Sequence, residues 1–199
     1  MSGYVIFGDS ISGNCHKVKW TADLLRLSYE WRETSVLKGG ARAKAFLALN
    51  PVGQVPTILT PEGRALAQSN AIILHLAERH GGGLIPQDGF ARARMYERLF
   101  FEQYSHEPYI AVRRFQKLYL KKRDDEIDPK LFERGEKALD VLNAQLSGAP
   151  WIAGDEFTLA DIALLAYTRL AHEGGFDLEK FPRVRGWVSR AERVLDIAD

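Results

Sequence analysis

The sequence is poor in cysteine: Cys15 is the single one among 199 residues. That count excludes an intrachain disulfide, a Cys-x-x-Cys redox pair and a multi-cysteine zinc site. It suits a reducing compartment, so we expect a cytoplasmic protein. Long hydrophobic runs are also missing, because the longest, such as 162–167, fall far short of the roughly 20 residues of a membrane-spanning helix. The first residues lack the basic and apolar regions of a signal peptide, so we expect no membrane partner.

An excess of one charge is missing too. Lysine and arginine number 27 against 26 aspartates and glutamates, a net charge of +1. Proteins that bind nucleic acid usually carry a basic excess, so we expect no such partner. Residues 1–80 hold 9 basic and 6 acidic side chains, and the remainder holds 18 and 20, giving +3 and −2. This weak asymmetry favours an anionic small molecule near the first part of the chain.

Strand signals alternate with helical patterns in the first 80 residues. Short β-forming runs occupy 4–7, 29–36, 55–59 and 64–67, and helical spacing of apolar residues occupies 14–27, 41–49 and 70–79. The order β-α-β-α-β-β-α predicts a four-stranded mixed sheet with helices on its faces.

The strand signal ends at a run of three glycines, and 81–90 is predicted to be a linker. Helical patterns then cover 91–120, with a break or bend at Pro108, and 131–146, 158–171 and 183–195. Thr158 and Asp161 have the spacing of a capping box at a helix start. The sequence therefore predicts two domains, 1–80 with the mixed sheet and an all-helical domain over 91–199.

Val55-Pro56 is the strongest single signal for a ligand. Proline is tolerated at the first position of a strand. A cis bond there would turn the Val55 N–H and C=O groups outward, free to pair with an extended peptide ligand. The alternative is a trans proline that only begins an edge strand.

Two further segments carry polar donors beside predicted helix starts. Ser69 is a candidate N-cap for the helix over 70–79, whose free N–H groups suit a carboxylate. Ser12 and Asn14 lie between the first strand and the first helix, where donors can hold an anion and lower the pKa of a thiol. In both segments the alternative is that the side chains only cap a helix or order a loop.

Together these segments resemble cytosolic glutathione S-transferases. The resemblance covers the whole chain, and the Ser-x-Asn version resembles bacterial serine-type members related to the theta and nu classes. It rests on Phe7-Gly8…Ser12-x-Asn14, Asn50-Pro51-x-Gly53-x-Val55-Pro56, Gln68-Ser69-Asn70-Ala71-Ile72 and Gly154-Asp155-x-Phe157-Thr158-Leu159-Ala160-Asp161-Ile162. It implies a thioredoxin-like N-terminal domain and an all-α C-terminal helical bundle.

The resemblance also implies how glutathione is bound. Ser12 would stabilise the glutathione thiolate and Asn14 would supply a second donor. Val55, with Pro56 in cis, would pair with the cysteinyl unit.

Gln68 and Ser69 would hold the γ-glutamyl group. Gln54 stands where many relatives have a lysine that faces the glycine carboxylate, and Lys38 is a candidate replacement. Glutathione would be a co-substrate, and no metal is implied.

The helical domain would supply the pocket for a small electrophile, lined by Tyr104, His106, Tyr109 and Arg113; core packing is the alternative for these side chains. The resemblance implies a homodimer in which Glu102 of a partner subunit reaches the γ-glutamyl ammonium. The implied activity is glutathione transfer in detoxification. The alternatives are a glutathione-dependent disulfide reductase and a low-turnover ligand-binding member. Cys15 is three residues too late to replace Ser12, so we expect it to be a bystander. The alternative is a nucleophile or mixed-disulfide site near the helix start, as in the beta and omega members of the family.

Overall fold

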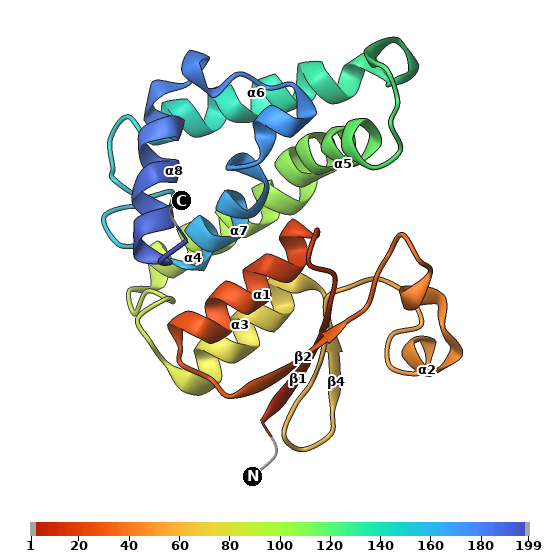
Figure 1. Cartoon of the computed structure of the whole chain (residues 1–199). Helices are drawn as coiled ribbons and strands as arrows, with labels where there is room; N and C mark the ends of the chain where they lie inside the picture. Colours follow the sequence, from red (N-terminus) through yellow and green to blue (C-terminus); the bar gives the residue numbers. More distant parts are fainter. Residues whose placement is uncertain (1–2, 198–199) are drawn as a thin grey trace. The chain divides into compact units, whose positions relative to one another are not determined.

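The computed structural model describes residues 3–197, which divide into two compact units between Leu84 and Ile85 (Figure 1). The first unit is built on a four-stranded sheet in the order β2-β1-β3-β4. β1 and β2 run parallel, whereas β3 is antiparallel to both β1 and β4. The predicted mixed sheet is thereby confirmed. Its strands are β1 (Tyr4–Gly8), β2 (Tyr29–Glu33), β3 (Thr57–Leu59) and β4 (Ala65–Ala67).

Two long helices of this unit, α1 (Gly13–Leu24) and α3 (Ser69–His80), contact each other on one face of the sheet (Figure 1). Their apolar residues recur every three or four positions, so one stripe of each helix is buried. Fully buried Ile6 and Ile58 from the central strands and Val18 and Ile72 from the helices form the core.

The segment predicted as one helix over 41–49 is shorter and divided. A 3-10 turn at Gly40–Arg42 is followed by α2 (Lys44–Leu47), because Ala43 between them has an extended backbone (φ −61°, ψ 139°). The second strand also ends earlier than predicted, at Glu33. Beyond it, the Val36 N–H donates to the Asp9 carboxylate instead of to a neighbouring strand.

The second unit is helical, as predicted. Its centre is α7, all ten residues of which are buried and which contacts α4, α5 and α8. No helix within residues 3–197 is both long and apolar enough to cross a membrane. The helices are α4 (Gly89–Phe101), α5 (Glu107–Leu118), α6 (Pro129–Gln145), α7 (Leu159–Thr168) and α8 (Pro182–Val194), with 3-10 turns at Asp124–Glu126, Ala171–Gly174 and Leu178–Lys180.

A π-helical turn, Glu102–His106, joins α4 to α5 immediately before Pro108. Proline has no N–H to donate, and its ring crowds the carbonyl four residues earlier, here that of Tyr104. The chain accommodates Pro108 by placing it in the first turn of α5 and widening the preceding turn. The predicted interruption is therefore a π turn.

The predicted capping box at the start of α7 is present. The Asp161 carboxylate, which is fully buried, accepts from the Thr158 N–H at 2.9 Å. It also accepts from Ile152 N–H and from Trp187 Nε1, each at 2.9 Å. Burial raises the pKa of Asp161, and these donors act in the opposite sense. Asp161 thus caps the start of α7 and also joins α7 to α8 through Trp187.

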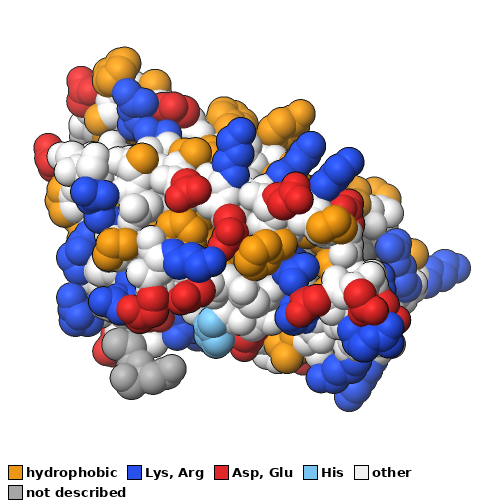
Figure 2. All heavy atoms as spheres, turned by 90° about the horizontal axis from the view of Figure 1, so that it is seen from above, with side chains coloured by type: hydrophobic (Ala, Val, Ile, Leu, Met, Phe, Trp, Pro, Cys, Tyr) orange, Lys and Arg blue, Asp and Glu red, His pale blue; other side chains and the backbone are white. Residues whose placement is uncertain are grey.

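The surface agrees with the near-zero net charge. On the face shown in Figure 2, lysine and arginine side chains are interspersed with aspartate and glutamate. No extended region of one sign covers that face.

Candidate functional site

The sheet register brings the three candidate segments to one end of the first unit. Phe7 of β1 pairs with Thr57 of β3, which pairs with Ala67 of β4. The chain leaves β1 toward Ser12, enters β3 from Val55, and leaves β4 toward Gln68. These paired residues lie at the same end of the three strands. The three candidate segments, which adjoin them in the sequence, therefore lie at that end of the sheet.

Ser12 stands at the N-cap position of α1 with an extended backbone (φ −91°, ψ 119°). Its hydroxyl makes no capping hydrogen bond to α1, although serine is among the commonest capping residues. The side chain is half-buried. The hydroxyl is therefore not used to cap α1, and it lies close enough to Cys15 to hydrogen-bond the thiol.

Asn14 and Ser69 connect the first and third segments. The Ser69 hydroxyl donates to Asn14 Oδ1 at 3.1 Å. The Asn14 carbonyl oxygen is the acceptor of this bond, and the amide nitrogen is the donor group of the same side chain. The structure thus brings together two residues that lie 55 positions apart.

Ser69 does not cap α3, so that prediction is wrong. Gln68 occupies the N-cap position, with φ 71° and ψ 112°, and Ser69 is the first residue of the helix. A positive φ is uncommon for a residue with a side chain, and such conformations concentrate at ligand sites. Gln68 is exposed and Ser69 is buried.

The loop before β3 is fixed by Asn50. Its side-chain amide donates to the Gln54 carbonyl at 2.8 Å and to Thr57 Oγ1 at 3.2 Å. The Val55-Pro56 bond is cis, as predicted. Val55 comes before the strand ladder, which starts at Thr57, so its main chain lies outside the sheet pairing. Gln54 is exposed and Pro56 is buried.

Arg42 is a cation that sequence reasoning missed. Gly53 has a φ of 68°, and a side chain added there would lie 2.8 Å from Arg42 Nη1. The guanidinium therefore lies beside the loop that carries Gln54 and Val55. Lys38, the predicted cation, is exposed on the loop after β2. No local pattern signals the approach of Arg42, because the turn at Gly53 creates it.

Cys15 is fully buried and accepts a hydrogen bond from the Asp9 N–H at 3.3 Å. Burial raises the pKa of the Cys15 thiol to about 11, against smaller opposing effects of hydrogen bonds from Ser12 and Asp9. Since the thiolate is the reactive form, this thiol is suited to packing rather than to nucleophilic chemistry.

In the second unit, the four residues predicted for an electrophile pocket have different surroundings. Tyr104 is 85% exposed. His106 is fully buried, with Nε2 at 2.9 Å from Thr168 Oγ1. The Tyr109 hydroxyl accepts from Arg134 at 2.8 Å.

Arg113 is buried, donates to the Gly174 carbonyl at 2.8 Å and lies over the ring of Phe132. Core packing, the alternative considered above, describes His106 and Arg113 better.

The predicted role of Glu102 is wrong. Its side chain is fully buried, and one carboxylate oxygen accepts from Gln103 Nε2 at 2.8 Å. A residue that reached a ligand on a partner subunit would have to be accessible from outside the chain. Glu102 is the first residue of the π turn, and its side chain points into the helical unit.

Two family models match the chain. The model for the glutathione S-transferase N-terminal domain matches residues 6–83, and the model for the C-terminal domain matches residues 95–193. The chain belongs to the glutathione S-transferase family. The candidate site at the strand ends lies within residues 6–83, which match the model of the N-terminal domain.

Solved structures of glutathione S-transferases are similar over nearly the full length. The protein from Pseudomonas fluorescens is 44% identical, with a TM-score of 0.91, and the match covers 95% of this chain and 94% of that one. The protein from Xanthobacter autotrophicus is 45% identical, with a TM-score of 0.89 and coverage of 95% and 92%. Ure2p in complex with glutathione shares the fold at 21% identity, with a TM-score of 0.88 and coverage of 98% and 92%.

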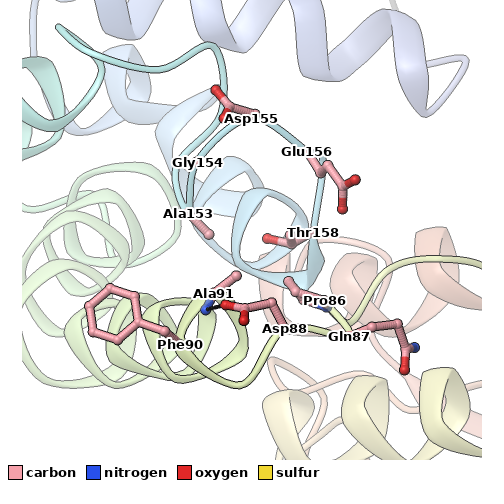
Figure 3. A pocket seen from close by; sticks show the side chains of 10 residues that line it. All are labelled: Pro86, Gln87, Asp88, Phe90, Ala91, Ala153, Gly154, Asp155, Glu156 and Thr158. Carbon is pink, nitrogen blue, oxygen red and sulfur yellow. Dashed lines mark hydrogen bonds between the residues drawn. The ribbon is translucent and has the colours of Figure 1, made fainter.

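The helical unit of this glutathione S-transferase family member also holds an open cavity of about 550 Å³ near the start of α4 (Figure 3). Asp88 on its rim caps α4 by accepting from the Ala91 N–H at 2.8 Å. None of the residues predicted for the electrophile lines this cavity. Within residues 3–197, no group of three or more histidine, cysteine or acidic side chains is arranged to hold a metal ion.

Proposed function

We propose that this chain binds glutathione at the edge of its sheet and uses it as a thiolate to attack a small electrophile. The observation that carries the proposal is the meeting of Ser12, the Asn14–Ser69 pair, Gln68 and the Val55 main chain at one end of three strands. Ure2p, which has the same fold, is known in complex with glutathione.

Each part of the tripeptide has a matching group in this arrangement. The Val55 N–H and C=O groups would pair with the cysteinyl unit like one more strand. The first turn of α3 offers N–H groups and a positive dipole end to the γ-glutamyl carboxylate, beside Gln68 and Ser69. Arg42, with Lys38 as the second candidate and the neutral Gln54 alongside, would face the glycine carboxylate.

Ser12 and Asn14 would act on the thiol itself. A hydrogen bond to a charged acceptor contributes about 1.5–3 kcal/mol, so two donors can lower a thiol pKa from roughly 8.5 toward neutral. The thiolate sulfur then bonds to an electrophilic carbon, and the leaving group departs with the electron pair, as chloride does from an activated aryl chloride. Since no protein base is needed, this serine-type mechanism requires only positioned donors.

Turnover assays test this proposal against its alternatives. We expect the chain to consume an activated aryl chloride with glutathione, and Ser12→Ala to lower that rate. Turnover of hydroxyethyl disulfide in place of the chloride would establish a disulfide reductase instead. Tight glutathione binding without turnover of either substrate would establish a ligand-binding member. Because Cys15 is buried, a reductase would have to use glutathione thiols alone.

We also propose that the chain forms a homodimer. Phe100 and Tyr104 are 74% and 85% exposed, one helical turn apart on the α4 segment and its continuation. Exposed aromatic side chains at such spacing are typical of a surface that another chain covers. Sedimentation should give twice the chain mass of 22.4 kDa, and a 22.4 kDa species at micromolar concentration would refute the dimer.

A further inference from the structure

Asp9 lies directly after β1 and bonds to most of the loop that carries Ser12. Its carbonyl accepts from the Ser12 N–H at 3.0 Å, and Oδ1 accepts from the Ile11 N–H at 3.1 Å. Its own N–H donates to Cys15 Sγ at 3.3 Å. The residue is only 2% exposed. The loop between β1 and α1 is therefore folded around one buried aspartate.

The second carboxylate oxygen of Asp9 reaches the neighbouring loop. Oδ2 accepts from the Val36 N–H at 2.6 Å, in the segment that follows β2. The same segment is tied to the end of β1 by the Thr34 N–H, which donates to the Gly8 carbonyl at 2.7 Å. Hydrogen bonds to a charged acceptor are shorter and stronger than neutral ones. Asp9 thus fixes the Ser12 loop against a second loop.

Glu33 completes this support from the other side. Its Oε1 accepts from the Ser10 N–H at 3.0 Å and from the Ser10 hydroxyl at 3.2 Å. Partial burial acts to raise the pKa of Glu33, but the hydrogen bonds from Ser10 and Trp31 hold it below its ordinary value. Three successive N–H groups, those of residues 10, 11 and 12, therefore donate to acceptors on Glu33 and Asp9. The direction of the Ser12 side chain follows from this fixed backbone.

We propose that Asp9 is a positioning residue that holds the Ser12 hydroxyl where a bound glutathione thiolate can accept from it. This inference rests on the proposed function. A donor displaced by a fraction of an ångström loses much of its stabilising effect, so the supporting carboxylate sets the strength of the Ser12 bond.

The charge of Asp9 acts in the opposite direction. Its field raises the pKa of the nearby Cys15 thiol, and by the same sign it would raise that of a bound glutathione thiol. Positioning and charge therefore predict opposite results when the carboxylate is replaced. That opposition allows a decisive experiment.

The experiment compares Asp9→Asn, which removes the charge and leaves one acceptor, with Asp9→Glu, which keeps the charge and moves the acceptor. The readouts are the thiol pKa of bound glutathione, from thiolate ultraviolet absorbance, and the pH profile of kcat/KM. Positioning predicts a higher thiol pKa in both variants, with kcat/KM lower by roughly 10-fold or more and the KM for glutathione changed by less than about 3-fold. Asp128→Asn is the matched control, because Asp128 caps α6 through the Lys130 N–H and lies in the other unit.

A lower thiol pKa in Asp9→Asn, or a wild-type pH profile in Asp9→Glu, would overturn the proposal. Amide hydrogen exchange of the wild type adds a test that needs no variant to fold. The Ile11 and Val36 amides should exchange as slowly as those of β1, and exchange at the rate of an open loop would also overturn it. If the wild type shows no thiolate absorbance with glutathione while these amides stay protected, the proposed function fails and the fixed loop stands.

Discussion

Replacing Asp161 with alanine should destabilise the helical unit far more than the loss of an ordinary helix cap. The carboxylate accepts from two backbone N–H groups, of Ile152 and Thr158, and from Trp187 Nε1, each at 2.9 Å. All three donors would lose their acceptor inside the unit. Each unsatisfied buried donor costs about 1–3 kcal/mol.

The expected total is smaller than the sum, because relaxation of the cavity and the relief of burying a carboxylate offset part of it. We expect a loss of about 3–5 kcal/mol in the free energy of unfolding. The wild type has only about 5–15 kcal/mol if it is typical of globular proteins. Asp161→Asn keeps one acceptor oxygen and should fall between wild type and alanine.

Urea unfolding followed by tryptophan fluorescence measures this change, since Trp151 and Trp187 both lie in the helical unit. Asp128→Ala is the control, because Asp128 is exposed and accepts one cap bond, from the Lys130 N–H at 3.0 Å. Loss of an exposed cap costs about 0.5–2 kcal/mol. If Asp161→Ala costs no more than this control, the reasoning about buried donors is wrong.

Three further predictions concern the first unit. Burial raises the pKa of Cys15 in the folded state from 9.0 to about 11, so its contribution to stability is complete below pH 9 and is lost as the pH rises through about 11. The Cys15→Ala variant should lack that alkaline loss of stability. The native thiol should also resist alkylation at pH 8. A thiol that reacts at pH 8 as fast in the native chain as in denaturant would refute this. If Arg42 contacts the glycine carboxylate of glutathione, Arg42→Gln should raise the KM for glutathione roughly 10-fold, against less than about 3-fold for Lys38→Gln. Equal effects of the two substitutions would refute the preference for Arg42. Ser69→Ala removes the bond to Asn14 and should raise the Kd for glutathione roughly 10-fold by calorimetry, whereas an unchanged Kd would leave that pair without a part in binding.

Much of the fold could be predicted because it depends on local patterns. The alternation of buried and half-buried residues along β1 and the apolar stripe of α1 are visible in the sequence. The capping box at Thr158 and Asp161 is a four-residue motif with a direct physical cause. A peptide ligand needs an outward-facing main chain at Val55, which predicts a cis Val55-Pro56 bond, and the bond is cis.

The remaining features depend on contacts between distant residues, which local patterns do not record. Glu102, the first residue of the π turn, is fully buried, although an acidic side chain in a helical segment ordinarily indicates a solvent-exposed face. Arg42 meets the loop at Gly53 through the turn before β3. The Ser69–Asn14 bond joins two helix starts, so each serine or asparagine alone reads as a cap. Glutamine rarely adopts a positive φ, so the sequence does not predict this conformation at Gln68.

The most direct test of the central claim is the pKa of the glutathione thiol bound to the wild type and to Ser12→Ala. If this chain stabilises the thiolate, the wild type should move that pKa from roughly 8.5 toward neutral, and Ser12→Ala should shift it back toward 8.5. The same substitution should lower kcat/KM by roughly 10–1,000-fold while glutathione affinity changes much less. A thiol that binds with an unshifted pKa, or a variant that retains the wild-type value and full activity, would contradict the account.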